Sequence, residues 1–281
     1  YWMESDTGPD ADTAIWRRPL AGGSAERVLG GIGMLIQFQG GFAVADGFVY
    51  AAVPGVPGPW DLVRVPAAGG APAVLATLAA APVGYAVVGD RLFWGDATAI
   101  RAVPLAGGAV QTLADGLASP VALTALADGV AWTEGVCCAH GQGGRVQRTR
   151  ADDSVVVLAD GIDDAVPIAA GGGRVFWGEG GPIGLIEGFG RVAAVPATGG
   201  AATTLAAGCS ATLPDMTTNG QDVFYVDRFR VERVDLAGAP PATVVADGFF
   251  VGSIAADATH LYRVTQPFSG IVAAPVAGGA E

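Results

Sequence analysis

One short phrase recurs seven times along the chain and constrains its fold more than any other feature. Most copies resemble the third one, Ile100–Gly108, which reads IRAVPLAGG. Successive copies begin 47, 38, 46, 46, 39 and 40 residues apart, at Ile15, Leu62, Ile100, Val146, Val192, Val231 and Ile271. A period of about 40 residues indicates one supersecondary unit repeated along the chain.

Each unit consists of four short segments with the composition of strands. In the third unit, Val83–Gly89 leads through a Gly-Asp turn into Arg91–Asp96, and Ile100–Gly108 and Ala109–Gly116 follow. The segments are apolar or β-branched and are bounded by Gly, Asp or Pro, which is typical of strands, and none has helical periodicity. The two glycines that close the phrase can supply the positive φ angles of a hairpin.

Four antiparallel strands repeated at this period predict a β-propeller. We therefore predict an all-β chain of seven four-stranded blades with no helical domain, forming one domain over residues 1–281. Blade one is expected to begin at its second strand, and blade seven to end after its third. The expected blades cover about residues 1–30, 31–78, 79–116, 117–161, 162–208, 209–248 and 249–281.

Composition excludes several classes of partner. The chain has 15 Arg, no Lys and a net charge of −12. Nucleic acid binding needs clustered cations, so we expect no nucleic acid partner. The charge also opposes docking on anionic membranes, and no apolar run approaches the ~18 residues of a membrane-spanning helix. We expect no direct membrane insertion.

The two ends of such blades differ in sequence. The turns between first and second strands, and between third and fourth strands, are short and alike, and they form what we call the uniform face. The opposite, variable face carries the connections between second and third strands and those between blades. Variable loops on a uniform scaffold commonly carry function, although drift in exposed loops is an equally simple explanation.

The second-to-third connections are long in blades one, two, four and five, and two of them contain apolar groups. Such groups could contact a partner or fold back over their own blade. The candidates for binding are Trp60 in blade two and Ile183, Leu185, Ile186 and Phe189 in blade five.

The second strand of most blades ends in an aromatic pair, such as Phe93-Trp94, which we expect to pack between neighbouring blades. In five blades an acidic residue lies two positions after the second residue of this pair. These residues are Glu4, Asp96, Glu134, Glu179 and Asp227. Gathered on the variable face, they would repel one another unless each is paired. We expect them to be mainly structural, accepting backbone N–H bonds, and to leave this face negative; attraction of a cation or a cationic ligand is the alternative.

The three cysteines are also expected on the variable face. Cys137 and Cys138 fall in the blade-four connection, and Cys209 precedes blade six. Their spacing and the presence of only two His residues oppose a zinc site. We predict a disulfide from Cys209 to Cys137 or Cys138, with a vicinal Cys137–Cys138 bond as the alternative. Either bond implies an oxidising, extracytoplasmic compartment.

Three segments carry a resemblance to a known family. Phe93–Asp96, Ala131–Glu134 and Phe176–Glu179 resemble the YWTD repeat of low-density-lipoprotein-receptor-type propellers. The whole chain resembles bacterial secreted relatives of these and of NHL-type propellers, whose blades carry a similar PLxGG phrase. The resemblance implies a propeller that serves mostly as a binding platform. Receptor-type propellers have six blades, so six is the alternative count.

We therefore predict a non-enzymatic binding or assembly module that is secreted, periplasmic or on the outer surface of a bacterium. Its partner would be a protein or a surface polymer, alone or within a larger surface assembly, and no cofactor is expected. The alternative is a hydrolase or lyase of lactonase type at the propeller mouth, using Ca²⁺ bound by carboxylates. His140 and His260 are expected on opposite faces, where they cannot cooperate.

Overall fold

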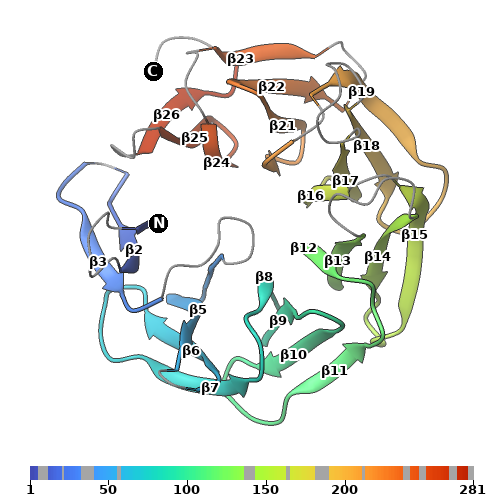
Figure 1. The fold of residues 1–281 in the computed structure, drawn as a ribbon. Coiled ribbons are helices and arrows are strands. Elements are labelled where there is room, and N and C mark those ends of the chain that lie inside the picture. Colours follow the sequence, from blue (N-terminus) through green and yellow to red (C-terminus); the bar gives the residue numbers. More distant parts are fainter. Residues whose placement is uncertain are drawn as a thin grey trace. The chain divides into compact units, whose positions relative to one another are not determined.

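The chain folds into strands alone wherever its structure is described. The structure is a computed structural model that describes residues 1–5, 12–20, 22–32, 41–55, 58–135, 143–162, 165–180, 190–210, 213–236, 241–246, 251–265 and 271–277. Every regular element within these ranges is a β-strand, and the strands form seven antiparallel sheets (Figure 1). The chain divides into two compact units, Tyr1–Pro120 and Val121–Glu281.

The first unit contains three sheets. Blade one consists of β1 (Trp2–Ser5), β2 (Thr13–Arg17) and β3 (Glu26–Leu29). Blade two consists of β4 (Ala43–Ala45), β5 (Phe48–Pro54), β6 (Trp60–Pro66) and β7 (Ala73–Leu78). Blade three consists of β8 (Val83–Val88), β9 (Arg91–Gly95), β10 (Ile100–Pro104) and β11 (Gln111–Ala114).

The second unit contains four sheets. The first strand of the first of these sheets, in blade four, begins at the boundary between the units. Blade four consists of β12 (Pro120–Leu126), β13 (Gly129–Glu134), β14 (Gly144–Thr149) and β15 (Val155–Ile162). Blade five consists of β16 (Ala165–Gly171), β17 (Arg174–Glu179), β18 (Gly190–Pro196) and β19 (Thr203–Cys209). Blade six consists of β20 (Met216–Thr218), β21 (Asp222–Asp227), β22 (Arg230–Asp235) and β23 (Ala242–Ala246). Blade seven consists of β24 (Val251–Ala256), β25 (His260–Thr265) and β26 (Ile271–Pro275).

This is a seven-bladed β-propeller, as the seven phrase copies predict. In every sheet, strands that follow one another in the chain are neighbours in space. Five sheets have four strands in the described ranges; blade one lacks a first strand there and blade seven lacks a fourth. Both gaps are where the phrase spacing predicts them. Treatment of residues 1–281 as a single domain stays a prediction.

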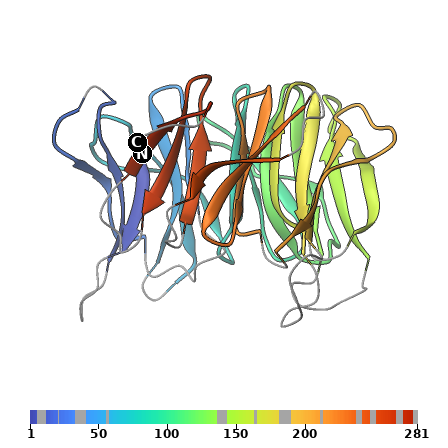
Figure 2. The same cartoon turned by 90° about the horizontal axis from the view of Figure 1, so that it is seen from above.

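The turns of the uniform face have the backbone geometry that their glycines predict. The phrase ends in two residues of positive φ in four blades, for example Gly69 at 88° and Gly70 at 145°. In blade two, Asp46 and Gly47 have φ values of 51° and 77°, which suits a two-residue hairpin turn. Figure 2 shows the sheets from the side, and within each sheet the strands run between the end that carries these turns and the end that carries the variable connections.

The second-strand aromatic residues pack between neighbouring blades. Trp94 is fully buried in a cluster with Leu62 and Leu78 of blade two, and Trp177 lies in a cluster with Leu158 and Ile162 of blade four. Because each sheet has two apolar faces, this packing buries surface that a single blade would leave exposed.

In blade two, the pairing between the second and third strands places the aromatic pair one residue away from its position in most blades. The second residue of the phrase lies opposite Trp94 in blade three and opposite Trp177 in blade five. In blade two, the same phrase position, Val63, lies opposite Ala51 instead, and Tyr50 faces the next phrase residue. Blade seven shows the same shift. The aromatic pairs of these two blades are therefore not equivalent to Phe93-Trp94, because pairing rather than sequence spacing fixes the facing residue.

Arginine at the third position of the phrase joins neighbouring blades. In each case Nη1 donates to the carbonyl oxygen of the residue that follows the third strand of the next blade. The bonds are Arg17 to Ala67 at 2.9 Å, Arg64 to Leu105 at 2.6 Å, Arg148 to Ala197 at 2.7 Å and Arg233 to Val276 at 3.1 Å. The residue that accepts also donates its own N–H to the first-to-second turn of its blade, as Ala67 does to Gly47. This network was not anticipated from the sequence, although the repeated Arg position is its visible signal.

Candidate functional site

The five predicted carboxylates occupy the same place in their blades. Each lies at or next to the end of the second strand, where the chain leaves the sheet on the variable face: Glu4 in β1, Asp96 just after β9, Glu134 in β13, Glu179 in β17 and Asp227 in β21. Glu134 and Glu179 are 7% and 6% exposed, so their charges are largely removed from water. Burial of this kind requires hydrogen-bond partners.

In two blades the carboxylate binds the tryptophan that precedes it by two residues. The indole Nε1 of Trp177 donates to Glu179 Oε1 at 2.7 Å, and Trp2 Nε1 donates to Glu4 Oε2 at 3.1 Å. Residues two apart on a strand project from the same face, which brings these two side chains together. In blade five this bond fixes the indole ring of Trp177 at the interface with blade four.

Arginines from the third strand pair with two of the carboxylates. Arg191 Nε lies 2.8 Å from Glu179 Oε2, and Arg101 Nε lies 2.5 Å from Asp96 Oδ2. These partners come from the strand paired with the acidic one, so cross-strand position was the signal that could have revealed them.

The remaining two carboxylates bind neutral donors. Gln147 Nε2 of β14 donates to Glu134 Oε2, and the backbone N–H of Ser210 donates to Asp227 Oδ1 at 3.0 Å. Asp96 accepts a further backbone N–H, from Thr98 at 3.0 Å. All five carboxylates thus hold strand ends or connectors in place. This arrangement fits a structural role, and a negative variable face stays a prediction.

Blades four and five share a second feature, at the point where their long connections return to the sheet. The connections run from residue 135 to 143 and from 180 to 189, between the ends of their strands. Each third strand then begins with Gly-Arg-Val, at Gly144 and Gly190. A Cβ on Gly144 would lie 2.8 Å from the carbonyl oxygen of Glu134, and one on Gly190 would lie 2.1 Å from that of Ser210. Only glycine permits such close backbone approach.

These two glycines fix the bases of neighbouring connections. Gly144 pairs with Ile162 and Gly190 with Cys209, and the register shifts by a bulge directly after each glycine. Strands β13 and β14 pack against β16 of blade five. The connections of blades four and five therefore leave adjacent sheets at the same edge, from bases held by backbone contacts. We call these two bases, Glu134–Gly135 with Gly144 and Glu179–Gly180 with Gly190, the paired loop bases.

Four of the predicted binding residues and two of the three cysteines lie outside the described part of the chain. These are Ile183, Leu185, Ile186 and Phe189, together with Cys137 and Cys138. Trp60 is described as the first residue of β6, and it is half-buried against the apolar cluster between blades two and three. Part of its indole thus serves packing.

Cys209 ends β19 and is only 3% exposed, and its thiol is free in the structure. Burial raises the pKa of this thiol, and the negative charge of Asp227 adds to the effect. Both of its expected disulfide partners lie outside the described residues, so the disulfide stays a prediction.

Asp215 is a buried carboxylate that the sequence did not single out. It lies just before β20 in blade six, and its Oδ2 accepts the backbone N–H of Ile254 in blade seven at 2.8 Å. Its Oδ1 accepts the N–H of Met216, also at 2.8 Å. Burial raises its pKa to about 6, and the two N–H donors oppose that rise. The carboxylate therefore joins the first strands of two neighbouring blades.

The part of the chain that the structure describes has neither a cluster of metal-binding side chains nor a membrane-spanning helix. Among the described residues, no three or more His, Cys, Asp or Glu side chains gather in an arrangement that could hold a metal ion. The same residues include no helix that is long and apolar enough to cross a membrane.

Comparison with known proteins identifies the fold but no family. No family model matches the chain, and no curated protein matches it by sequence. Among solved structures, a chain of a nidogen/laminin complex is similar with a TM-score of 0.59 and 16% identity, covering 84% of this chain and 88% of that one. A computationally designed protein gives a TM-score of 0.65 and 13% identity, with 99% and 82% covered.

A calcium-binding protein, regucalcin from Agrobacterium tumefaciens, is similar with a TM-score of 0.57 and 14% identity, with 82% of each chain covered. At these identities the similarities support the propeller fold and carry no residue of a site across to this chain.

Proposed function

We propose that the chain is a non-enzymatic binding module that recognises a protein or a surface polymer outside the cytoplasm. Its binding surface is formed by the connections of blades four and five, carried on the paired loop bases. The observation that carries this proposal is that two long connections leave adjacent sheets at one edge, from bases where only glycine fits.

The contrast between the two faces supports a surface on the variable side. On the uniform face the same short turn recurs. In it, the first glycine of the phrase donates its backbone N–H to the carbonyl oxygen of the phrase proline, as Gly69 does to Pro66 at 2.8 Å. On the variable face the connections between second and third strands differ in length. The short connection of blade six spans residues 228–229, and the long one of blade five spans residues 180–189. Side chains that differ between blades can give specificity that repeated turns cannot.

Fixed bases favour binding because they reduce the freedom that a loop must lose. Glu179 is held by both Trp177 and Arg191, and Glu134 is held by Gln147. A connection whose ends are already positioned has less conformational entropy to lose when a partner orders it. The apolar residues Ile186 and Phe189 would then supply the contact area.

The carboxylate contacts support binding over metal-dependent hydrolysis. A catalytic Ca²⁺ would need several carboxylate oxygens that converge on one point. Here the five carboxylates are engaged by indole, guanidinium, amide or backbone donors of their own or neighbouring strands. The nidogen/laminin structure, which by its name is a complex of two proteins, provides a precedent for a protein partner on a related fold.

The experiment replaces the proposed surface while leaving the sheets intact. In one variant, residues 180–189 are exchanged for the two-residue connection of blade six, Arg228-Phe229; in a second, Ile186 and Phe189 both become Ala. Binding of each purified protein to the surface fraction of the source organism is measured before and after protease treatment of that fraction. We expect both variants to lose most of the binding of the unmodified protein.

The matched control is Leu20→Ala, which removes an apolar side chain that is 83% exposed and belongs to a uniform-face turn. It should bind like the unmodified protein. The proposal fails if both loop variants are folded, as judged by thermal unfolding, and still bind normally. Protease sensitivity of the surface fraction distinguishes a protein partner from a polymer.

A further inference from the structure

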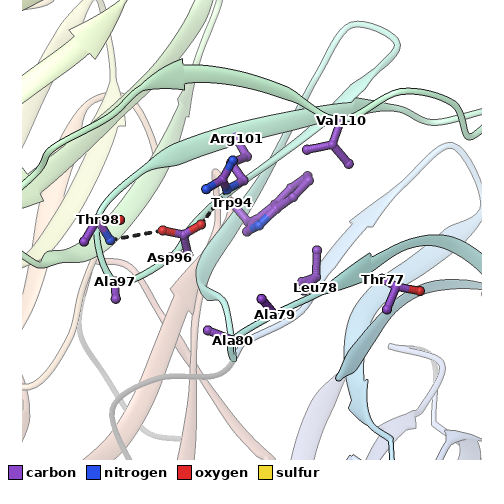
Figure 3. A pocket seen from close by; sticks show the side chains of 10 residues that line it. All are labelled: Thr77, Leu78, Ala79, Ala80, Trp94, Asp96, Ala97, Thr98, Arg101 and Val110. Atoms are coloured by element: carbon purple, nitrogen blue, oxygen red, sulfur yellow. Dashed lines mark hydrogen bonds and ion pairs between the residues drawn. The ribbon is translucent and has the colours of Figure 1, made fainter. Parts of the chain in front are cut away.

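A pocket of about 370 Å³ lies between blades two and three of the first unit, on the side of the variable face. Leu78, Ala79 and Ala80, at the end of β7 and just beyond it, form one wall (Figure 3). Trp94 and Arg101, from β9 and β10, form the opposite wall. Its volume is within the range of pockets that bind small molecules.

Small residues in the connector keep this pocket open. The chain from blade two to blade three reads Ala79-Ala80-Ala81-Pro82. The corresponding connector between blades five and six contains Leu213, which is 4% exposed and packs in the apolar cluster of that interface with Met216. The connector between blades two and three has no side chain of that size, so space remains next to the buried Trp94.

Arg101 is an unusual residue at its position. It is the second residue of the phrase, opposite Trp94 and directed towards blade two. The other blades carry Trp16, Val63, Gln147, Ala193, Glu232 and Val272 there. The guanidinium shares its side of the pocket with the apolar Trp94 and Val110 and with the carboxylate of Asp96 (Figure 3). The pocket therefore combines an apolar surface with one cationic group, which suits a ligand that has an apolar body and an anionic end.

The guanidinium is held in place by two bonds that do not exhaust its donors. Arg101 Nε pairs with Asp96 Oδ2 at 2.5 Å, and Nη1 donates to Thr112 Oγ1 at 2.6 Å. Asp96 is itself positioned by the N–H of Thr98 at 3.0 Å. The side chain of Arg101 is 33% exposed and lines the pocket, where its remaining Nη N–H groups would be the donors to a ligand. A guanidinium fixed in this way is suited to a planar anion, because little side-chain entropy remains to be lost.

We propose that this pocket binds a small carboxylate with an apolar or aromatic body. The carboxylate would pair with Arg101, and the body would lie against Trp94 and Leu78. A single negative charge is favoured over the double charge of a phosphate monoester, since Asp96 lies beside the guanidinium and repels any anion bound there. The site belongs to blades two and three and is independent of the surface proposed on blades four and five.

Benzoate is a suitable probe, with benzamide as its neutral match and phenyl phosphate as the dianion. Binding to the whole chain is measured by isothermal titration calorimetry. We expect benzoate to bind in about the millimolar range and each of the other two to bind at least about tenfold more weakly. Equal binding of benzamide, or no benzoate binding up to about 10 mM, would overturn the proposal.

Two variants separate ligand recognition from folding. Arg101→Gln removes the charge, and Ala80→Met fills the pocket while leaving the Arg101–Asp96 pair in place. Both should weaken benzoate binding at least about tenfold. Arg18→Gln, which removes an exposed charge from the same unit, should leave it unchanged. Folding is checked by thermal unfolding. If Arg101→Gln does not fold, Ala80→Met decides alone, and unchanged benzoate binding by a folded Ala80→Met variant contradicts the proposal.

Discussion

The indole nitrogen of Trp177 donates to the carboxylate of Glu179, two residues further along β17, at 2.7 Å. Blade four has the same pair, Trp132 and Glu134, yet within the described residues the Trp132 indole N–H has no hydrogen-bond partner although it is fully buried. The difference lies on the facing strand. Gln147 stands opposite Trp132 and donates to Glu134, whereas the residue opposite Trp177 is Ala193.

This comparison predicts the effect of Gln147→Ala. Without the amide, Glu134 should accept the Trp132 indole N–H, so one hydrogen bond replaces another and stability should change by less than about 1 kcal/mol. The Trp132 indole proton should move downfield in a ¹H–¹⁵N spectrum and exchange more slowly with solvent. The reverse change, Ala193→Gln, should have the opposite effect on Trp177. An unchanged Trp132 resonance in a folded Gln147→Ala protein would argue against the competition.

Loss of the hydrogen bond from Arg148 of blade four to Ala197 of blade five should destabilise the folded protein. Arg148 is 5% exposed, and it donates to Ala197 O and to Asp128 Oδ1, the latter at 2.5 Å. Arg148→Met should lower the free energy of unfolding by about 1.5–3 kcal/mol, since bonds to a charged donor are lost and the carbonyl is left without its partner. Urea denaturation measures the change. Arg150→Met, at an exposed position two residues on, is the control and should be close to neutral; equal losses in both variants would refute a specific bond.

The paired loop bases predict strong intolerance of side chains. Gly190→Ala would place a Cβ 2.1 Å from the Ser210 carbonyl oxygen, so strand β19 or β18 must shift. We expect a loss of about 1–3 kcal/mol, the range for overpacking. Gly58→Ala, where a Cβ would meet nothing within 4 Å, should be neutral by comparison. Similar melting temperatures for the two variants would show that the close approach has no energetic consequence.

Asp215 should make stability depend on pH. Burial raises its pKa in the folded protein to about 6 from an ordinary value of 3.8. A raised pKa means that the folded state binds the proton more tightly, so this residue stabilises the protein below about pH 4 and loses that contribution as pH rises through about 6.

Asp215→Asn removes this titration. The stability of the unmodified protein relative to the variant should therefore increase as pH falls from about 7 to about 4, as measured by chemical denaturation at several pH values. Parallel pH profiles for the two proteins would show that another group is responsible.

Several features followed directly from the amino-acid sequence. Seven phrase copies predicted seven blades, and the incomplete first and last sheets appeared where the spacing placed them. Gly69 and Gly70 predicted their hairpin because a positive φ is a local property that glycine alone adopts at little cost. Trp94 was correctly placed between blades since a repeat of this kind has no other way to bury it.

Other features were decided only by the tertiary structure. Glu179 pairs with Arg191 although Arg174 is nearer in the chain, and Asp96 pairs with Arg101 although Arg91 is equally near. Strand pairing, and not distance along the chain, selects these partners. In blade two, Ala51 lies opposite the second residue of the phrase, whereas Trp94 lies opposite that residue in blade three. This difference in register depends on how the second and third strands pair. Local conformation was therefore determined by the sequence itself, whereas the partner of each buried charge was determined by which strand lay beside it.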